Sequence, residues 1–305
     1  MDALITSLVQ AGFAPERILP RARMARYTTF RVGGEADVLV QIASEQDIAV
    51  ALRAARRAGV PVTVIGNGSN LLVRDGGIRG LVLRIAGDFS QIRREDDCLI
   101  AQAGATIAAC AQFAQREGLG GLAELSGIPG TIGGGVIMNA GAYGGELSQV
   151  VASVRTIAQS DGAPLSFAGD ALGFSYRHSA MMDASVIVTE VRMRLTPGDP
   201  ESIRERMDGL SRARREKQPL EYPSAGSTFK RPEGLFAAKL IDDCGLRGLR
   251  VGDAQVSEKH TGFVVNRGNA TASDILALMD EITRVVRERT GVTLQPEVRI
   301  LGEDA

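Results

Sequence analysis

Apolar residues recur with the period of a helix between positions 48 and 55 of this chain. Ser44 stands just before them, where its side chain can cap a first turn, and Gly59 follows where a glycine commonly ends a helix. The runs 37–42 and 61–65 on either side are short and rich in residues that favour strands. This pattern predicts a strand, a helix and a second strand in succession.

The rest of the chain alternates between short apolar runs and further helical periods. The Asp161-Gly162 pair predicts a hairpin turn, and the segment 196–200, with two prolines and a glycine, is the clearest linker. A short, loosely attached helix is expected within residues 1–20. Further strands are expected at 71–73, 81–85, 98–103, 154–158, 186–195, 263–265 and 297–301, and helices at 107–115, 200–216, 235–241 and 271–290. We therefore expect an α+β protein with three regions, of which the first two act together.

The composition excludes several classes of function. The 35 Lys and Arg balance 36 Asp and Glu, so the chain lacks the positive charge on which sequence-independent nucleic-acid binding depends. Aromatic residues make up 4% of the chain, too few for a base-stacking surface. No apolar run reaches the length of a membrane span, and the start Met1-Asp2-Ala3 lacks the basic residues of a signal peptide. We expect a soluble, cytoplasmic protein with no nucleic-acid partner, no membrane insertion and no obligatory protein partner.

Cysteine and histidine are scarce in this chain. Cys98, Cys110 and Cys244 form no closely spaced pair and fall in apolar periods, which predicts buried, unpaired thiols in a reducing compartment. His178 and His260 lie far apart, with no cysteine at metal-ligand spacing. This argues against a structural zinc site and against a histidine-based nucleophilic triad, so no metal is predicted.

A first glycine-rich segment, Gly66-Asn67-Gly68-Ser69-Asn70-Leu71, follows the strand expected at 61–65. Glycine and asparagine tolerate positive φ, so successive backbone amides can point into one concavity and hold an anion. The segment is neither a Walker loop nor a GxGxxG motif, because no Gly-Lys-Ser/Thr follows it and it opens no helix. A tight turn between two strands is the alternative interpretation.

A second glycine-rich segment occupies residues 126–135, with the sequence Ser-Gly-Ile-Pro-Gly-Thr-Ile-Gly-Gly-Gly. Isoleucines among glycines indicate a buried backbone that another group approaches closely. The run of small residues continues through 139–145. A flat ring with a diphosphate would suit such a loop, and a close strand–helix contact without any ligand is the alternative.

Together with five further segments, these loops resemble the UDP-N-acetylenolpyruvoylglucosamine reductases, flavin enzymes of the second step of bacterial peptidoglycan precursor synthesis. The matching segments run in order from about residue 22 to 302, at 29–34, 66–72, 126–135, 139–144, 176–179, 226–230 and 295–299. The resemblance implies a PCMH (vanillyl-alcohol-oxidase) type of FAD-binding region in two parts, 22–85 and 86–198. A C-terminal α+β substrate domain at 199–292 and a strand at 293–305 that returns to the active site would follow. Residues 1–21 would form an N-terminal helix and loop.

The resemblance also implies roles for individual residues. Non-covalent FAD would be bound by Gly66, Asn67, Gly68, Ser69, Asn70, Leu71, Ser126, Gly127, Gly130, Thr131, Ile132, Gly133 and Gly134. A UDP-sugar substrate would contact Tyr176, Lys217, Lys230 and Asn139. The catalytic residues would be Ser227, Arg177 and Glu297, with NADPH as the co-substrate.

These catalytic residue types suit the reduction of an enolpyruvyl group. Once a hydride reaches C3, the centre at C2 is enolate-like and must be neutralised and protonated. Arg177 can pair with the substrate carboxylate, and the Ser227 hydroxyl can protonate such a strongly basic carbon. Glu297 could orient Ser227 or act as an acid itself, and the sequence leaves both roles open. All four lysines lie between 217 and 259, where their point charges suit the substrate's diphosphate.

The expected function is therefore NADPH-dependent reduction of UDP-N-acetylglucosamine enolpyruvate to UDP-N-acetylmuramate through FAD. An alternative keeps the fold but makes the protein an FAD-linked oxidase or dehydrogenase of a hydroxy acid or alcohol. A third hypothesis is a non-enzymatic nucleotide-binding protein. The 50-residue interval from Arg177 to Ser227 is too short for the tyrosine-bearing insertion of the longer subclass, so the chain resembles the shorter subclass.

Overall fold

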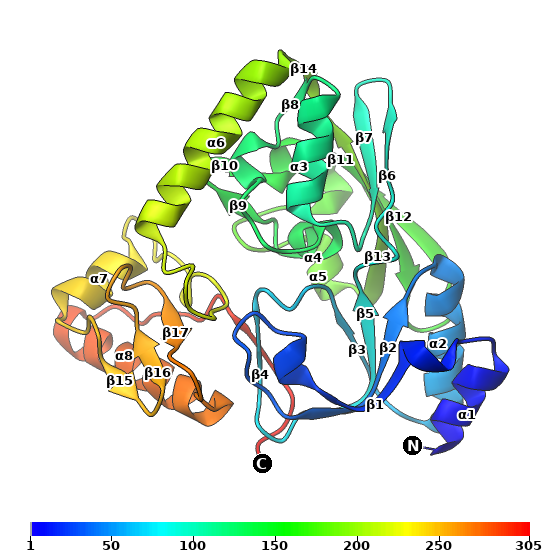
Figure 1. Cartoon of the computed structure of the whole chain (residues 1–305), viewed down its shortest axis with the longest axis horizontal. Helices are drawn as coiled ribbons and strands as arrows, with labels where there is room; N and C mark the ends of the chain where they lie inside the picture. Colours follow the sequence, from blue (N-terminus) through cyan, green and yellow to red (C-terminus); the bar gives the residue numbers. More distant parts are fainter. Residues whose placement is uncertain (1) are drawn as a thin grey trace. The chain divides into compact units, whose positions relative to one another are not determined.

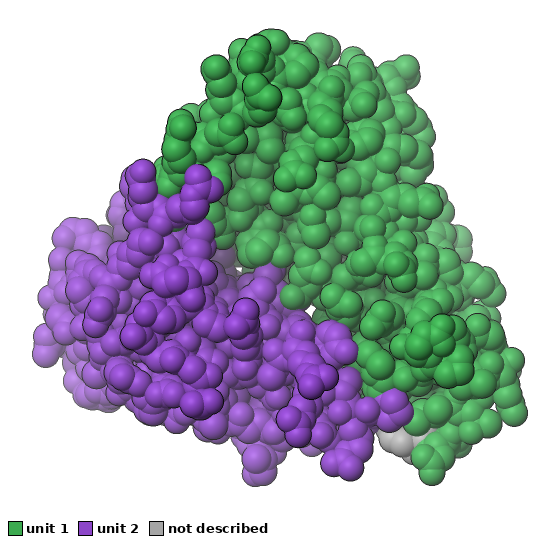
Figure 2. All heavy atoms as spheres, viewed as in Figure 1, with its two compact units in different colours: residues 1–19, 38–67, 80–214 green, residues 20–37, 68–79, 215–305 purple. Residues whose placement is uncertain are grey.

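The computed structural model describes residues 2–305, so Met1, the first residue of the predicted N-terminal helix and loop, lies outside it. The chain divides into two compact units, which Figure 2 colours separately. Unit 1 contains the described residues up to 19 together with 38–67 and 80–214, and unit 2 contains 20–37, 68–79 and 215–305. Each unit is therefore assembled from segments that are distant in sequence.

The first predicted strand–helix–strand succession is confirmed. Helix α2 (Glu45–Ala58) lies beside α1 (Asp2–Gln10) and begins with a capping box, in which the Ser44 and Asp47 side chains each accept the other's backbone N–H. Gly59 ends α2 with a φ of 65°. The strands around α2 belong to a sheet of order β1-β2-β5-β3 (Figure 1), formed by β1 (Ile18–Arg23), β2 (Glu35–Ile42), β5 (Ile78–Ile85) and β3 (Val62–Ile65).

A second sheet in unit 1 has the order β12-β11-β13-β7-β6, and its neighbouring strands are antiparallel. The predicted turn at Asp161-Gly162 is confirmed and joins β11 to β12, a strand that the sequence pattern does not predict. Most of β12 is exposed, so it lacks the apolar alternation of a half-buried strand. The strands are β6 (Ile92–Glu95), β7 (Cys98–Gln102), β11 (Val151–Ala158), β12 (Pro164–Ala168) and β13 (Val186–Arg194).

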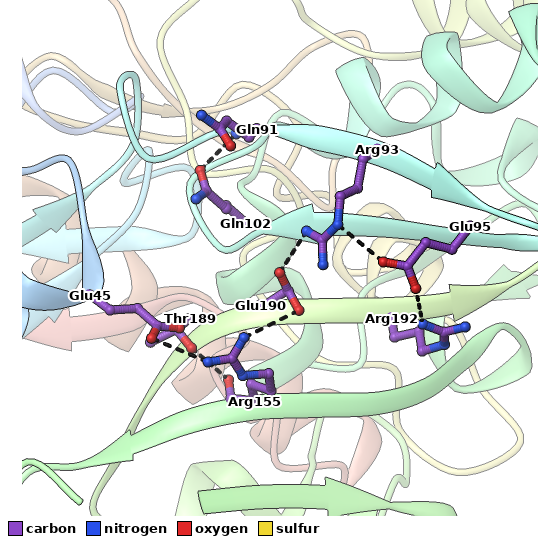
Figure 3. A network of polar contacts seen from close by, with 9 residues as sticks. All are labelled: Glu45, Gln91, Arg93, Glu95, Gln102, Arg155, Thr189, Glu190 and Arg192. Carbon is purple, nitrogen blue, oxygen red and sulfur yellow. Dashed lines mark hydrogen bonds and ion pairs between the residues drawn. The ribbon is translucent and has the colours of Figure 1, made fainter. Parts of the chain in front are cut away.

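Ion pairs cross the strands of this second sheet (Figure 3). The Glu190 carboxylate on β13 lies 2.8 Å from the Arg93 guanidinium on β6 and 3.7 Å from that of Arg155 on β11. Arg155 also reaches the Glu45 carboxylate, at the start of α2, at 3.3 Å. An exposed ion pair contributes about 0–1 kcal/mol. These ion pairs therefore add little stability, but they connect the second sheet to α2 within unit 1.

The helices against this sheet include one that the sequence does not predict. Helix α3 (Ile107–Arg116) is confirmed, with Thr106 as its N-cap. Helix α4 (Ile132–Ile137), which contacts β13 and β7, occupies a stretch expected to be an open loop. The shorter elements are α5 (Ala180–Asp183), β8 (Leu119–Gly120), β9 (Gly141–Ala142), β10 (Gly145–Glu146) and β14 (Thr196–Pro197), with 3₁₀ turns at Pro15–Arg17, Met24–Arg26, Ala123–Leu125, Leu147–Gln149 and Gly169–Leu172.

The helix predicted at 200–216 is confirmed as α6 (Pro200–Lys217). The Asp199 carboxylate accepts the backbone N–H of Ser202 at 2.9 Å and so caps the first turn. Proline fits the first helical position because its missing N–H would have no partner there. The boundary between the two units falls within this helix, after Arg214.

Unit 2 is built around the long helix α8 (Ala272–Thr290), which packs on a sheet of order β15-β16-β17. The helix predicted at 271–290 is confirmed at both ends, by a capping box at Thr271 and by Gly291 with a φ of 76°. Helix α7 starts two residues later than predicted. The other elements are α7 (Ala237–Asp243), β15 (Arg250–Val251), β16 (Ala254–Val256), β17 (Val264–Asn266) and the parallel pair β4 (Leu71–Val73) and β18 (Arg299–Leu301).

Asp75 adds a second cap to α8 from a distant part of the sequence. Its carboxylate accepts the backbone N–H groups of Ala272 and Ser273, both at 2.9 Å, and the Ser273 hydroxyl at 2.6 Å. Burial alone would raise the pKa of Asp75, but these hydrogen bonds favour the charged form and lower the pKa. The ionised carboxylate therefore ties residues 68–79 to the start of α8 within unit 2.

Each unit has its own hydrophobic core. The cores contain, for example, Leu99 and Ile107 in unit 1, and Phe30 and Val256 in unit 2. Cys98, Cys110 and Cys244 are buried and unpaired, as predicted, and burial raises the pKa of the Cys110 thiol to about 12. Within residues 2–305, no helix has the length and apolar character needed to cross a membrane.

Candidate active site

The first glycine-rich segment, residues 66–71, bends between β3 and β4. Within residues 2–305, the backbone N–H groups of Asn67, Gly68 and Ser69 donate to no protein acceptor. Gly68 has a φ of +64°, and a Cβ on it would lie 2.0 Å from the Tyr27 carbonyl oxygen, so only glycine fits. The segment therefore has three successive N–H donors without a protein acceptor, which an anion-binding loop requires.

Gly66 and Asn67 contact the second glycine-rich segment. A Cβ on Gly66 would lie 2.3 Å from the Thr131 hydroxyl oxygen, which explains the glycine there. The Asn67 side-chain amide donates to the Pro129 carbonyl oxygen at 3.4 Å. The two segments that the sequence singled out therefore meet within unit 1.

The second glycine-rich segment ends as helix α4 and not as an open loop. The N–H groups of its first helical residues, Ile132, Gly133 and Gly134, donate within the protein at 2.7, 3.0 and 3.4 Å. The first two donate to backbone carbonyls and the third to the hydroxyl of the N-cap residue, Thr131. These amides therefore have hydrogen-bond acceptors within the protein, unlike the N–H groups of Asn67, Gly68 and Ser69 in the first segment.

Part of this second segment is exposed. Thr131, Ile132 and Gly133, all predicted to bind FAD, are buried, whereas Gly127 and Gly134 are exposed. A Cβ on Gly134 would have its nearest neighbour, the Thr131 hydroxyl oxygen, at an ordinary 3.5 Å. The protein's own packing therefore does not require a glycine at position 134, and a group outside the protein can account for it.

Arg214, on α6, lies along the exposed Gly127 and was missed by the sequence analysis. A Cβ on Gly127 would be 3.0 Å from Nη1 and 3.1 Å from Cδ of this arginine. Among the described residues, 2–305, its guanidinium forms no ion pair. Burial lowers the pKa of Arg214, although nearby Tyr143 partly opposes the shift. A desolvated positive charge beside a glycine-rich segment suits an anionic group, but one arginine in an arginine-rich helix carries no sequence signal.

Arg177, in unit 1, lies in a tight turn. The turn is closed by two backbone hydrogen bonds between Ser175 and His178, at 3.1 and 3.2 Å, and Arg177 has a φ of +57°. The guanidinium donates to the Gly141 carbonyl oxygen at 3.2 Å and lies 4.9 Å from the centre of the Tyr176 ring. A carbonyl and an aromatic ring therefore hold this charged side chain in place.

Asn139 supports the same turn. It is 0% exposed, its Nδ2 donates to the Ser175 carbonyl oxygen at 3.1 Å, and its Oδ1 accepts the Ser148 N–H at 2.9 Å. These contacts enclose the side chain, and the predicted contact of Asn139 with the substrate stays a prediction. We assign Asn139 to holding the turn that carries Arg177.

Ser227 and Glu297 lie on neighbouring segments of unit 2. The Thr228 carbonyl oxygen accepts the Glu297 N–H at 2.8 Å, and Phe229 pairs antiparallel with Pro296. Ser227 is exposed and Glu297 is half-buried. Two predicted catalytic residues that are 70 positions apart in sequence thus lie on two segments that pair with each other.

The predicted substrate-binding lysines have different environments. Lys217 is the exposed last residue of α6, and the Lys259 ammonium donates to the Arg215 carbonyl oxygen at 2.7 Å. Cations at the end of a helix stabilise its free carbonyls, so Lys259 fixes the turn that carries Lys217. Lys230 is half-buried, and its backbone N–H donates to the Gln295 carbonyl oxygen at 2.8 Å. Lys230 is therefore held on the segment that also carries Ser227.

Strained backbone conformations gather in the segments that the sequence singled out. Within residues 2–305, the non-glycine residues with positive φ are Arg21, Arg31, Asp96, Asn139, Tyr143 and Arg177. Four of these six lie in the segments 29–34, 139–144 and 176–179. Each such conformation costs on the order of 1–3 kcal/mol, and they cluster at functional sites. Within unit 1, the strain at Asn139, Tyr143 and Arg177 thus marks the segments 139–144 and 176–179 as functional candidates.

The chain also matches known proteins. Residues 36–167 match the sequence profile of an FAD-binding domain, a range that lies mostly in unit 1 and includes α2, α3 and α4. Together with the glycine-rich segments, this match defines the class of the protein: it is an FAD-dependent oxidoreductase. The predicted fold class is confirmed as α+β, with an FAD-binding region followed by a C-terminal α+β domain.

Its relatives cover nearly the whole chain. Residues 218–301 match the profile of the UDP-N-acetylenolpyruvoylglucosamine reductase C-terminal domain. The UDP-N-acetylenolpyruvoylglucosamine reductase of Clostridium tetani is 44% identical over 300 residues, 98% of this chain and 97% of its own, and that of Agathobacter rectalis is 50% identical over 292 residues, 92% of each. The crystal structure of the reductase from Thermus caldophilus matches with a TM-score of 0.78 and 38% identity, over 93% of this chain and 98% of its own. The chain therefore belongs to the UDP-N-acetylenolpyruvoylglucosamine reductase family, and the predicted resemblance is confirmed.

Proposed function

We propose that this protein reduces UDP-N-acetylglucosamine enolpyruvate to UDP-N-acetylmuramate, with NADPH as the hydride source and FAD as the hydride carrier. The observation that carries the proposal is the match to reductases of that name over more than nine-tenths of the chain. We place the reaction in the cytoplasm, in peptidoglycan precursor synthesis, with a UDP-sugar as substrate and no obligatory protein partner.

Groups on the two glycine-rich segments fit an anionic dinucleotide. The open N–H groups of Asn67, Gly68 and Ser69 can hold a diphosphate, and the Arg214 guanidinium adds a positive charge beside Gly127. The bare backbone at Gly134 leaves room for a ring. Bound there without a covalent bond, FAD would supply hydride transfer from NADPH to C3 of the enolpyruvyl group. The other predicted FAD-binding residues shape these segments: Gly66, Asn70, Leu71, Ser126, Gly130, Thr131, Ile132 and Gly133.

The chain's own catalytic residues stabilise the negative charge that develops at C2 and supply the proton that C2 receives. We assign the Arg177 guanidinium to the substrate carboxylate, where it stabilises negative charge as it develops. The Ser227 hydroxyl donates the proton to C2, and Glu297, on the paired segment, resupplies that proton. Since Ser227 is exposed on the segment that Thr228 anchors, its hydroxyl is free to face a substrate.

The remaining predicted residues are assigned to the sugar nucleotide. Lys217 and Lys230 carry point charges that suit its diphosphate. Tyr176 is 46% exposed and stacks on Arg177, so it forms a wall beside the carboxylate-binding guanidinium. These roles are separable in kinetics, because loss of a diphosphate contact weakens substrate binding, whereas loss of Ser227 slows proton transfer.

Replacing Ser227 by alanine tests the proposal. We expect NADPH to bleach the flavin of Ser227→Ala at a rate within about twofold of the wild type, while reoxidation by the enolpyruvyl substrate slows by roughly 10²–10⁴-fold. Anaerobic stopped-flow absorbance measures both half-reactions separately. Ser224→Ala is the matched control, since the carbonyl of Ser224 accepts the Thr29 hydroxyl and survives the change. Equal loss of both half-reactions in Ser227→Ala would make Ser227 structural, and a substrate that reduces the flavin would favour the oxidase alternative.

A further inference from the structure

Thr228, the residue after Ser227, is the most firmly fixed residue of its segment. It is 0% exposed. Its backbone N–H donates to the Gly262 carbonyl oxygen at 2.9 Å, and its side-chain oxygen accepts the backbone N–H of Val264, at the start of β17, also at 2.9 Å. The hydroxyl therefore accepts a backbone N–H of β17, as the carbonyl of a neighbouring strand would. It joins the segment of Ser227 to β17.

The same threonine also joins that segment to the segment of Glu297. Its carbonyl oxygen accepts the Glu297 N–H at 2.8 Å, and two residues on, the Lys230 N–H donates to the Gln295 carbonyl oxygen at 2.8 Å. On the far side, the Asn70 side-chain amide donates to the Glu297 carbonyl oxygen at 3.1 Å. The backbone of Glu297 is thus held between the segments of Thr228 and Asn70, and Thr228 contacts both β17 and the segment of Glu297.

From these contacts we infer that Thr228 is a positioning residue, which fixes the Ser227 hydroxyl and the Glu297 carboxylate relative to each other for the protonation of C2. The inference rests on the proposed function and adds a residue to it. Proton transfer from a serine requires hydrogen-bond distance to the carbon that it protonates, and a displacement of about 1 Å can cost about 10²-fold in rate. A residue that touches no reacting atom can therefore set the rate by holding its neighbour.

The chemistry of the side chain makes the inference testable. Valine has nearly the shape of threonine but cannot accept a hydrogen bond, so Thr228→Val leaves the Val264 N–H buried without a partner. Serine keeps the hydroxyl and loses only a methyl group. Thr261→Val is the matched control, because Thr261 is 4% exposed and its hydroxyl donates to the Ala238 carbonyl oxygen at 2.6 Å, a group on neither the segment of Ser227 nor that of Glu297.

We expect Thr228→Val to reoxidise its flavin with the enolpyruvyl substrate about 10–100-fold more slowly than wild type, with reduction by NADPH unchanged within about twofold. Thr228→Ser and Thr261→Val should stay within about threefold in both half-reactions. Adding Thr228→Val to Ser227→Ala should slow reoxidation little further, because the two residues act as a unit. If the valine variant does not fold, the same measurement is made on Thr228→Ala. This variant leaves room for a water molecule at the Val264 N–H.

The outcomes separate this inference from the proposed function. A wild-type protein whose reduced flavin is not reoxidised by the enolpyruvyl substrate overturns both, before any variant is made. A Thr228→Val variant with wild-type reoxidation, or with equal losses in both half-reactions, overturns the role of Thr228 alone. So does a full multiplicative loss in the double variant, since independent effects would then act at two sites.

Discussion

The two glycine-rich segments have similar compositions, but they need glycine for different physical reasons. In the first, residues 66–71, the N–H groups of Asn67, Gly68 and Ser69 donate to no acceptor within residues 2–305. In the second, residues 126–135, the amides that open α4 are all used within the protein. One segment thus leaves backbone N–H groups without a protein acceptor, and the other lets a helix approach its neighbours.

Packing explains two glycines of α4 directly. A Cβ on Gly133 would lie 2.8 Å from the Ala103 Cβ, and one on Gly135 would lie 2.8 Å from the Ile107 side chain. This segment is therefore a close contact of the fold, as one of the two interpretations raised from the sequence has it, and its exposed edge leaves the binding of a ring and a diphosphate a prediction. A high glycine content indicates that another group packs closely against the backbone, but it does not show whether that group belongs to a ligand or to the protein.

The largest effect is expected at the first segment. Gly68→Ala would place a Cβ 2.0 Å from a backbone oxygen, that of Tyr27, at a φ of +64°. Left-handed strain and overpacking together should destabilise the protein by about 2–4 kcal/mol and distort the open amides, so FAD occupancy should also fall. Urea unfolding of the apoprotein and the flavin content of the purified protein measure the two effects.

Gly59→Ala provides the matched control for that change. Gly59 has nearly the same φ, +65°, but nothing lies within 4 Å of a Cβ there. Its cost should be the left-handed strain alone, about 1–2 kcal/mol, with full flavin content. Equal destabilisation of the two variants would show that the contact with Tyr27 is unimportant and would weaken the contrast between the segments.

Sequence signals predicted the elements whose ends carry strong caps. Ser44 and Gly59 bound α2, and Thr271 and Gly291 bound α8, as their residue types indicate. The pattern failed where tertiary packing overrides local preference. Three successive glycines disfavour a helix, yet α4 forms because Gly133 allows a close approach to Ala103.

The candidate site was less accessible from sequence than the fold. Ser227 and Glu297 were selected by resemblance, since a spacing of 70 residues indicates no contact by itself. Thr228 and Arg214 were missed because their roles depend on burial and on neighbours contributed by distant segments. The catalytic roles of Ser227, Arg177 and Glu297 stay predictions that kinetics must test.

A smaller effect is expected inside α4. Gly133→Ala would press a Cβ against the Ala103 Cβ, neither of which can rotate away. Overpacking of about 1–3 kcal/mol should outweigh the gain of up to about 1 kcal/mol in helix propensity, leaving a net loss of roughly 1–2 kcal/mol. Thermal unfolding of the apoprotein measures this, and an unchanged or raised melting temperature would show that packing does not dictate the glycine.

The smallest effect on stability, and the sharpest comparison, is expected one residue further along the same helix. In Gly134→Ala the new Cβ meets nothing closer than 3.5 Å, so the apoprotein should gain about 0.5–1 kcal/mol from helix propensity and melt about 1–3 °C higher. If the exposed backbone at Gly134 is kept bare for the cofactor, the same variant should bind FAD about 10-fold more weakly, a difference of roughly 1.4 kcal/mol. Fluorescence titration of apoprotein with FAD measures that affinity, with Gly133→Ala as the neighbouring control. Wild-type affinity in Gly134→Ala would mean that the second segment serves only the fold, leaving the diphosphate-binding role to residues 66–71.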